Sequence, residues 1–173
     1  MNSKIIYGSC ILYVSLIGLG GCSRTITVTS NQQANIQVDL VAVTGPMKEF
    51  WQTQSMTNYW RVNNPTRSEA INNKYLYQLK FGNDNQPTKV LAENDMDQVW
   101  KNWNDAEYLF VLANLVPTDN KPFEDKVGNS DPRRKWIPFS YDCWKDGHIR
   151  IKVTEAGIVI LTAPKNKRQC QCN

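Results

Sequence analysis

Histidine is the scarcest chemically active residue here, because His148 is the only one among 173 residues. A zinc site wants four ligands with characteristic spacing, and the cysteines do not provide them, so we expect no metal site. The sequence also lacks a glycine-rich phosphate loop, a metalloprotease helix pair and a nucleophile elbow. We therefore predict a protein that has no catalytic residues and no bound cofactor.

An excess of charge of one sign is missing as well. The chain has 20 basic and 16 acidic residues, mixed along its length. Without residues 1–21, which include Lys4, there remain 19 basic and 16 acidic residues, a net charge of +3. Proteins that bind nucleic acid gather lysine and arginine into a stripe along the phosphates. We therefore expect no nucleic-acid partner.

The one hydrophobic run, Ile11 to Leu19, is too short to span a bilayer, which takes about 20 apolar residues. Lys4 precedes the run, and two small residues, Gly20 and Gly21, follow it. This order is typical of a secretory signal peptide. We predict a signal peptide at residues 1–21 and a single domain at 22–173, in which residues 22–24 form a tether.

The end of this leader, Leu19-Gly20-Gly21-Cys22, resembles the lipobox of bacterial lipoproteins. The resemblance implies cleavage before Cys22, a diacylglycerol group on its thiol and an acyl chain on its new amino terminus. More than one chain is needed for stable anchoring. Ser23, where other lipoproteins carry Asp, resembles the signal that sorts to the outer membrane. The expected location is the periplasmic face of that membrane.

Three further cysteines lie near the end of the chain, and a periplasmic location permits a disulfide among them. Two expected strands, 149–153 and 157–161, are joined by a turn. If that turn is centred between residues 155 and 156, position 168 lies opposite Cys143. We predict a bridge from Cys143 to Cys170 or to Cys172. The bridge would close a loop of roughly 27 residues. By lowering the entropy of the unfolded chain, it would stabilise the fold by about 3 kcal/mol.

Periodicity predicts the fold class. Alternation of apolar and polar residues indicates strands at 25–29, 35–43 and 75–81, with another around 90–91. In the second of these strands, Ile36, Val38 and Leu40 face one way, and Gln37 and Asp39 face the other. The nearly continuous apolar run 108–115 indicates a central strand buried on both faces, and 135–139 precedes the closing hairpin.

Two short helices are expected between these strands. One follows Pro46 and places Met47, Phe50 and Trp51 on one face, and the other carries Met96, Val99, Trp100 and Trp103. Residues 63–68 and 72–73 are expected to be polar loop. The prediction is a mainly β protein, a β-sandwich of about eight strands with two short helical insertions.

Large aromatic side chains are the candidates for partner contact. Trp51, Trp60, Phe123 and Trp144 could be interface anchors or platforms for sugar rings, although burial in the core is the commoner role of such residues. The longest expected loop, 117–134, is of a length that is usually functional or mobile. The residues alone do not choose among these roles.

The order of elements resembles the outer-membrane lipoprotein of type VI secretion systems, the TssJ family. The similarity rests on the lipobox and on segments such as Val38–Val43, Val111–Ala113, Arg134–Trp136 and Ile149–Val153. It implies a transthyretin-like β-sandwich that holds the periplasmic domain of an inner-membrane partner of the IcmF type. The family's long loop after the first strand is only Ser30–Ala34 here, so the partner surface is expected to have moved, with 117–134 as the candidate.

Two other functions fit the same anchor. One is a peptidoglycan- or glycan-binding module that stacks exposed tryptophan rings on sugars. The other is a pilotin-like chaperone of a secretin.

Overall fold

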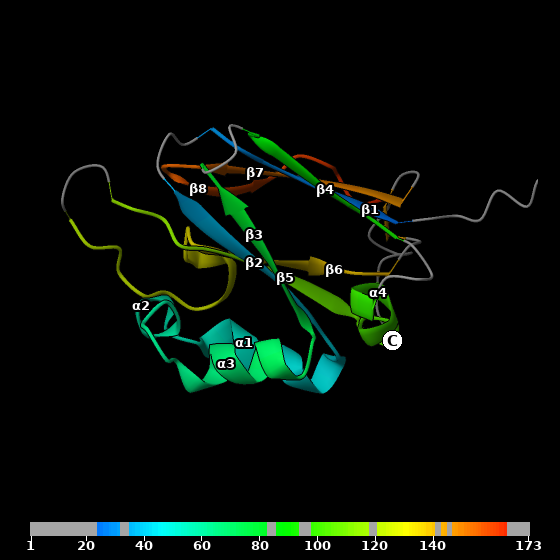
Figure 1. Ribbon diagram of the computed structural model, residues 1–173, viewed down its shortest axis with the longest axis horizontal. Helices are drawn as coiled ribbons and strands as arrows, with labels where there is room; N and C mark the ends of the chain where they lie inside the picture. Colours follow the sequence, from blue (N-terminus) through cyan, green and yellow to red (C-terminus); the bar gives the residue numbers. More distant parts are fainter. Residues whose placement is uncertain are drawn as a thin grey trace, which may run out of the picture.

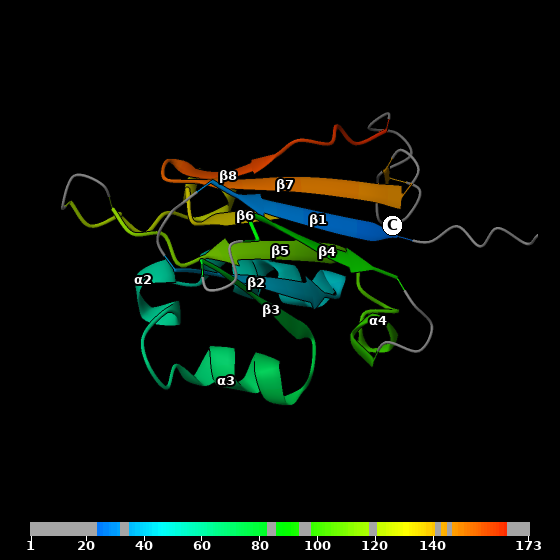
Figure 2. The same cartoon turned by 45° about the horizontal axis from the view of Figure 1, so that its top comes forward.

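The computed structural model of the chain describes residues 24–31, 35–82, 86–93, 98–117, 121–140, 143–144 and 147–165. In these residues eight strands form two four-stranded sheets, which confirms the predicted mainly β sandwich (Figures 1 and 2). The strands are β1 (Thr25–Ser30), β2 (Ile36–Val43), β3 (Leu76–Phe81), β4 (Thr88–Ala92), β5 (Tyr108–Ala113), β6 (Arg134–Pro138), β7 (His148–Thr154) and β8 (Gly157–Ile160). Within the described ranges no helix is long and apolar enough to cross a membrane.

The first sheet has the order β4-β1-β7-β8, and β1 is one of its two central strands. β1 pairs antiparallel with β4 and parallel with β7, so both of its edges are hydrogen-bonded. Its apolar residues Ile26 and Val28 are buried, whereas the threonines between them are only partly covered. One face of this sheet packs on the core and the other is open, which explains the strict alternation in its sequence.

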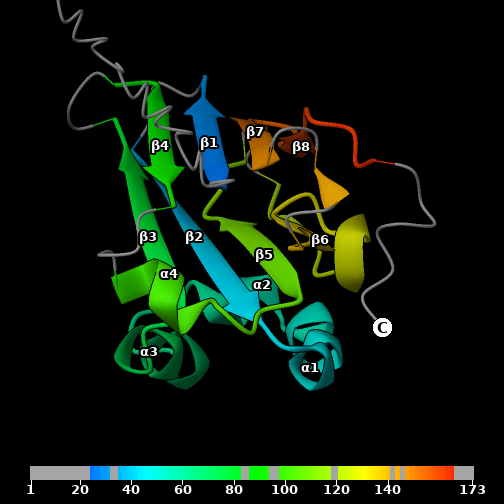
Figure 3. The same cartoon turned by 90° about the vertical axis from the view of Figure 1, so that its right-hand side faces the viewer.

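In the second sheet, β3-β2-β5-β6, the central strands β2 and β5 are buried on both faces, whereas the edge strand β3 exposes Gln78 and Lys80. Ile36, Val38 and Leu40 of β2 pack between the sheets, while Val41 and Phe110 pack against helices on the opposite face. Figure 3 shows the resulting three layers: first sheet, second sheet, and α1, α2 and α3. The prediction that 108–115 forms a doubly buried central strand is confirmed by β5, which lies between β2 and β6.

The helices occur in two insertions, as predicted. The first holds η1 (Gly45–Met47), α1 (Lys48–Thr53), α2 (Met56–Tyr59) and α3 (Pro65–Asn72), and the second holds α4 (Gln98–Asn102). A further 3-10 turn, η2 (Gly128–Ser130), lies in the connection from β5 to β6. The expected apolar face of the first helix is only partly formed, because Trp51 is buried but Met47 and Phe50 are exposed.

The prediction of polar loop at 63–68 and 72–73 is wrong, because α3 occupies most of these positions. The side chain of Asn64 accepts a hydrogen bond of 2.9 Å from the Arg67 backbone N–H, which caps the helix. Pro65 follows at the first helical position, where its fixed φ suits a helix and its missing N–H costs nothing. These two residues mark a helix start that the polar composition of the segment concealed.

The closing hairpin has the predicted register over its strands, since Ile151 pairs with Ile160 and Thr154 with Gly157. Further from the turn the register changes, because the Lys165 amide donates to the Cys143 carbonyl at 2.8 Å. The expectation that position 168 lies opposite Cys143 is therefore wrong. Cys143 is buried, and Cys170 and Cys172 lie outside the described residues, so the disulfide itself stays a prediction.

Candidate docking surface

At one end of the sandwich, hydrogen bonds and ion pairs among buried side chains form an extended network within the described residues. We call this end the α2 end, defined by α2, residues 60–64 and the described parts, 114–117 and 121–133, of the connection between β5 and β6. Figures 1 and 2 show this connection beside α2 at the end of the long axis away from α4. The predicted long loop 117–134 is therefore packed on the helical insertion where the structure describes it.

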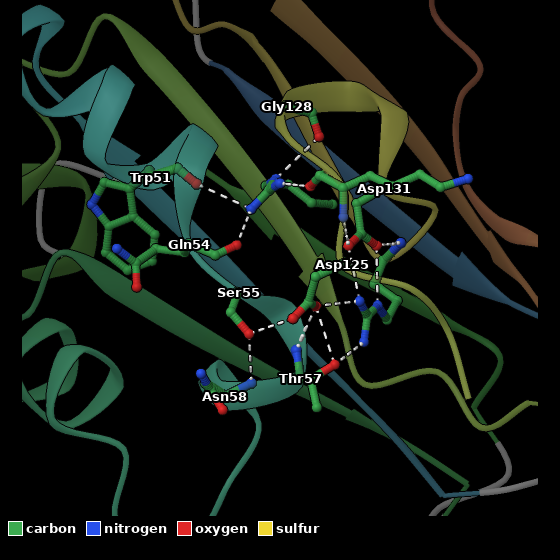
Figure 4. A network of polar contacts seen from close by, with 11 residues as sticks. Trp51, Gln54, Ser55, Thr57, Asn58, Asp125, Gly128 and Asp131 are labelled. Atoms are coloured by element: carbon green, nitrogen blue, oxygen red, sulfur yellow. Dashed lines mark hydrogen bonds and ion pairs between the residues drawn. The ribbon is translucent and has the colours of Figure 1, made fainter.

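A buried arginine fastens this loop to α2 (Figure 4). The Arg133 guanidinium donates to Asp131 at 2.9 and 3.0 Å and to Asp125 at 2.6 Å. Asp125 in turn accepts from the Ser55 hydroxyl at 2.5 Å and from the Thr57 backbone N–H at 2.9 Å. We call these five residues the Arg133 latch, because they join α2 to the middle of the loop, at Asp125, and to its carboxy-terminal end, at Asp131 and Arg133.

A second buried arginine, Arg134, binds only backbone carbonyls among its described hydrogen bonds. It donates to Gly128 at 3.0 Å and to Gln54 at 2.6 Å, and also to Trp51 and Lys126. These carbonyls belong to α1, to the residue that caps it, and to the loop. One guanidinium thus satisfies acceptors of two separate segments, which holds the segments together.

The latch fixes the charge of its members. Burial by itself would raise the pKa of Asp125, but hydrogen bonds from Ser55, Thr57 and Arg133 outweigh it and lower the pKa to about 2. Burial would lower the pKa of Arg133, and the carboxylates of Asp131 and Asp125 raise it above its ordinary value. Each group thus stabilises the charged form of its neighbour, which gives a structural ion network.

A buried triad secures the other side of α2. Asp39, in β2, is fully buried and accepts a hydrogen bond of 2.8 Å from the Tyr59 hydroxyl and one of 2.7 Å from Arg67 Nε. Burial and the Asp39 charge together raise the pKa of Tyr59 above its ordinary value. The phenol therefore stays protonated and serves as a donor. The triad ties α2 and α3 to the second sheet.

A polar hollow of about 410 Å³ opens next to the triad. It is lined by Arg61 and Arg67, by Trp60 and Val62, and by the amide-bearing Gln37, Asn63, Asn64 and Asn114, and none of its lining residues is acidic. Val62, at its rim, is 89% exposed. Asn63 has a φ of 60°, a conformation that costs free energy in a residue with a side chain. The hollow therefore offers cations, amides and apolar contacts, which include the exposed Val62 and Ile71, to a ligand or partner.

Two of the four aromatic candidates for partner contact are in the wrong place for that role. Trp51 is fully buried among the side chains between the second sheet and the helices. Trp144 is buried between the sheets, where its indole N–H donates to the Pro138 carbonyl at 3.0 Å. Both rings fill cores, so neither is a surface anchor. Trp51 and Trp144 therefore have the other role considered for them, burial in the core.

Trp60 and Phe123 are half-buried and lie at the α2 end. The Arg67 guanidinium lies 5.0 Å from the centre of the Trp60 ring, and the Arg133 guanidinium lies 5.5 Å from the centre of Phe123. The other half-buried tryptophan, Trp136, carries the Lys48 ammonium 3.7 Å from its ring centre. A cation already covers a face of each ring, which disfavours stacking on sugar.

Sequence reasoning missed the residues that build this end. Asp125, Asp131 and Arg133 lie in a stretch of scattered charges, and only their three-dimensional pairing distinguishes them from solvated surface residues. The Asn64-Pro65 pair was the one available sign of order nearby. Two other predicted site residues, Cys22 and Ser23, lie outside the described residues. Within the described ranges no three His, Cys, Asp or Glu residues form a potential metal site.

No protein-family model and no curated protein matches the sequence. Among solved structures, Serratia marcescens Lip, a membrane-bound component of the type VI secretion system, is 16% identical with a TM-score of 0.47. That similarity covers 80% of this chain and 96% of Lip.

Two other solved structures are similar to the same degree. The C-terminal domain of the type VI secretion protein TssM from EAEC is 14% identical with a TM-score of 0.47, covering 80% of this chain and 99% of that domain. The type VI secretion lipoprotein TssJ1 from Pseudomonas aeruginosa is 12% identical with a TM-score of 0.46, covering 83% and 98%. At these scores and identities, the likenesses establish neither a family nor a function.

Proposed function

We propose that this chain is a non-catalytic lipoprotein on the periplasmic face of the outer membrane, which holds a partner protein of a secretion-type envelope complex at its α2 end. The leader with Leu19-Gly20-Gly21-Cys22 supports the anchor. The Arg133 latch is the observation that carries the docking role. Because a loop fixed in advance loses less entropy on binding, its rigid attachment suits a docking surface.

The charges of the residues that line the hollow indicate which kind of partner segment would bind there. Arg61 is exposed at its rim, and the lining residues include no carboxylate to neutralise it. An acidic segment with an apolar neighbour would pair with Arg61 and cover Val62. The proposed partner is therefore the periplasmic domain of an IcmF-type inner-membrane protein that presents such a segment.

The docking proposal is tested by calorimetry with the soluble 24–173 fragment and the purified periplasmic domain of the IcmF-type protein from the same organism. We expect stoichiometric binding, weakened at least about tenfold by Arg61→Glu, because like charges across an interface are costly. Arg150→Glu is the matched control, since Arg150 is exposed on the open face of the first sheet. Absence of binding, or an equal effect of both variants, would contradict the proposal.

The anchor is tested separately by fractionation of cells that express the full chain. Cys22→Ser removes the thiol to which the lipid is attached, so the protein should leave the membrane fraction on carbonate washing. A membrane fraction unchanged by the substitution would refute lipid anchoring. Retention of the 24–173 fragment on isolated peptidoglycan, with a change in tryptophan fluorescence, would favour the glycan-binding function instead.

A further inference from the structure

The second end of the sandwich is built around the first described residue, Arg24. Arg24 lies two positions after Cys22, and two residues of fully extended chain reach at most about 7 Å. The point at which a lipid would be attached to the chain therefore remains within about that distance of Arg24. How firmly Arg24 is held decides how freely the domain can turn about its attachment.

Arg24 is held through its backbone and its side chain, both by Glu93. Its backbone N–H donates to Glu93 Oε2 at 2.7 Å, and its carbonyl accepts from the Glu93 N–H at 2.7 Å. Its guanidinium donates to both carboxylate oxygens, at 2.7 and 3.2 Å. The two side chains are only 14% and 23% exposed. Four hydrogen bonds thus join the start of β1 to the end of β4.

Aromatic rings complete this arrangement. The Arg24 guanidinium lies 5.3 Å from the centre of Trp100 and 4.9 Å from that of Phe139, and these two rings are stacked 6.0 Å apart. Trp100, in α4, also donates its indole N–H to the Ala92 carbonyl at 2.8 Å. We call Arg24, Glu93, Trp100 and Phe139 the Arg24 clamp. The clamp makes the start of β1, the end of β4 and α4 one rigid unit.

The clamp and the proposed docking surface lie at opposite ends of the molecule. β1 begins beside α4 and runs toward the other end, and α2 lies at that far end of the long axis (Figures 1 and 2). The six residues of β1 alone span about 20 Å along this axis. A surface brought into contact with the clamp would therefore leave the α2 end well away from it.

We infer that the clamp end is a membrane-contacting surface, which rests on the phospholipid headgroup layer and directs the α2 end away from the bilayer. This inference depends on the lipid anchor of the proposed function. We call Cys22 and Ser23, the two residues before Arg24, the junction. Because the headgroup layer is roughly 5–7 Å thick on each side of a bilayer, a junction of this length is just long enough to cross it. The clamp then fixes the orientation of the domain relative to the membrane, because so short a junction limits rotation of the domain about its attachment.

The surface chemistry around the clamp fits a phospholipid layer. Lys101 is exposed on α4, beside a hollow of about 310 Å³ that Glu93, Trp100 and Asn104 also line. Among the described residues that line the hollow, Glu93 is paired with Arg24, and Lys101 is the remaining charged group. A lysine close to a bilayer gains attraction from anionic lipids and phosphates.

The test uses the full acylated protein in vesicles of phosphatidylethanolamine and phosphatidylglycerol that contain headgroup-nitroxide lipid. A dye is coupled through an azide-bearing residue in place of Lys101 or, in the control, of Val62, so that the cysteines remain untouched. We expect the dye at 101 to be quenched at least about threefold more than the dye at 62, because β1 alone spans about 20 Å between the two ends.

Flotation of the same vesicles separates failure of the anchor from failure of the orientation. Protein that floats but shows equal quenching at both positions, or stronger quenching at 62, would overturn the orientation while the anchor stands. Protein that does not float would overturn both. The acyl-free chain beginning at Ser23 should neither float nor be quenched.

A linker variant tests whether the short junction is the cause. Insertion of eight Gly and Ser residues between Ser23 and Arg24 adds a mean reach of roughly 16 Å. Acylation and flotation should persist, while the difference in quenching between the two positions should fall to less than about half. An undiminished difference would show that something other than the clamped junction sets the orientation, and would overturn the inference.

Discussion

The partners of Asp39 can be identified only in the folded protein, although its position in a strand can be predicted from the sequence. Alternation along β2 correctly places Gln37 and Asp39 on the face opposite Ile36, Val38 and Leu40. That face is covered by helices, and Asp39 is fully buried. Its charge is paired with Arg67, 28 residues away, and it accepts a hydrogen bond from the Tyr59 hydroxyl, 20 residues away. Local periodicity contains no information about such distant partners.

The pKa of Asp125 predicts a pH dependence of stability. It is lowered to about 2 in the folded protein, below its ordinary value of 3.8. A lowered pKa stabilises the fold above the unfolded-state value, and this contribution is lost as pH falls toward the folded value. Asp125 is 36% exposed, so we discount the contribution for solvent screening to about 1 kcal/mol. Urea unfolding between about pH 5 and pH 2 measures it.

Asp125→Asn and the neighbouring exposed Glu124→Gln form a matched pair for this measurement. The free energy of unfolding of the wild type should exceed that of Asp125→Asn at pH 5, and the difference should shrink toward pH 2. Glu124→Gln should follow the wild type throughout. A constant difference between wild type and Asp125→Asn would refute the role of ionisation.

At the scale of elements, strands were predicted well and loops poorly, for a physical reason. The hairpin of β7 and β8 could be placed because each residue pairs with a near neighbour in sequence across a short turn. The register change at Cys143 and the fastening of the long loop depend on contacts with distant segments. In the loop, Arg133 reaches Thr57, which is 76 residues away. Side-chain type alone does not identify such a pair.

The hairpin turn makes a prediction of its own at Gly157. Its φ is +141°, and a Cβ at this position would lie 2.9 Å from the Pro132 carbonyl oxygen. Because both the backbone conformation and the close approach oppose a side chain, Gly157→Ala should lower the free energy of unfolding by about 1–3 kcal/mol. Urea denaturation followed by circular dichroism measures the change.

Val159→Ala is the control for the hairpin, because Val159 lies exposed on the same strand. Its effect should stay within about 0.5 kcal/mol, as is usual for surface positions. Equal midpoints for Gly157→Ala and the wild type would mean that the turn can relax, contrary to our expectation.

On the scale of the whole molecule, the second sheet belongs to two cores. Neighbouring residues of β5 point to opposite sides, since Leu109 and Val111 pack between the sheets and Phe110 packs against the helices. Composition and periodicity predicted one domain and a doubly buried strand. They did not predict that helices would provide the second cover, because only one short helix was expected in the first insertion and polar loop was expected where α3 lies.

The shared sheet predicts that the sandwich and its helical layer unfold together. Phe110→Ala leaves a cavity under the helices and should cost about 3–5 kcal/mol. Near-ultraviolet dichroism reports on the tryptophans, and far-ultraviolet dichroism reports on the sheets. Both transitions should move to lower urea by the same amount, because two-state unfolding gives coincident curves.

Val90→Ala, at an exposed position of β4, serves as the control and should barely shift either curve. If the near-ultraviolet transition alone moved in Phe110→Ala, the helical layer would be a separate cooperative unit.

The position of β1 between β4 and β7 has a mechanical consequence. The strand that begins at the Arg24 clamp runs lengthwise through the sheet and is hydrogen-bonded along both sides. Tension applied between the amino-terminal end and the α2 end would pull along β1, so its two ladders would be loaded in shear. Many hydrogen bonds would then have to break at once, which would make unfolding slow. The unfolding rate sets the resistance of a protein to forced unfolding. A chain held at both ends in this way can transmit a pull across the envelope and keep its shape.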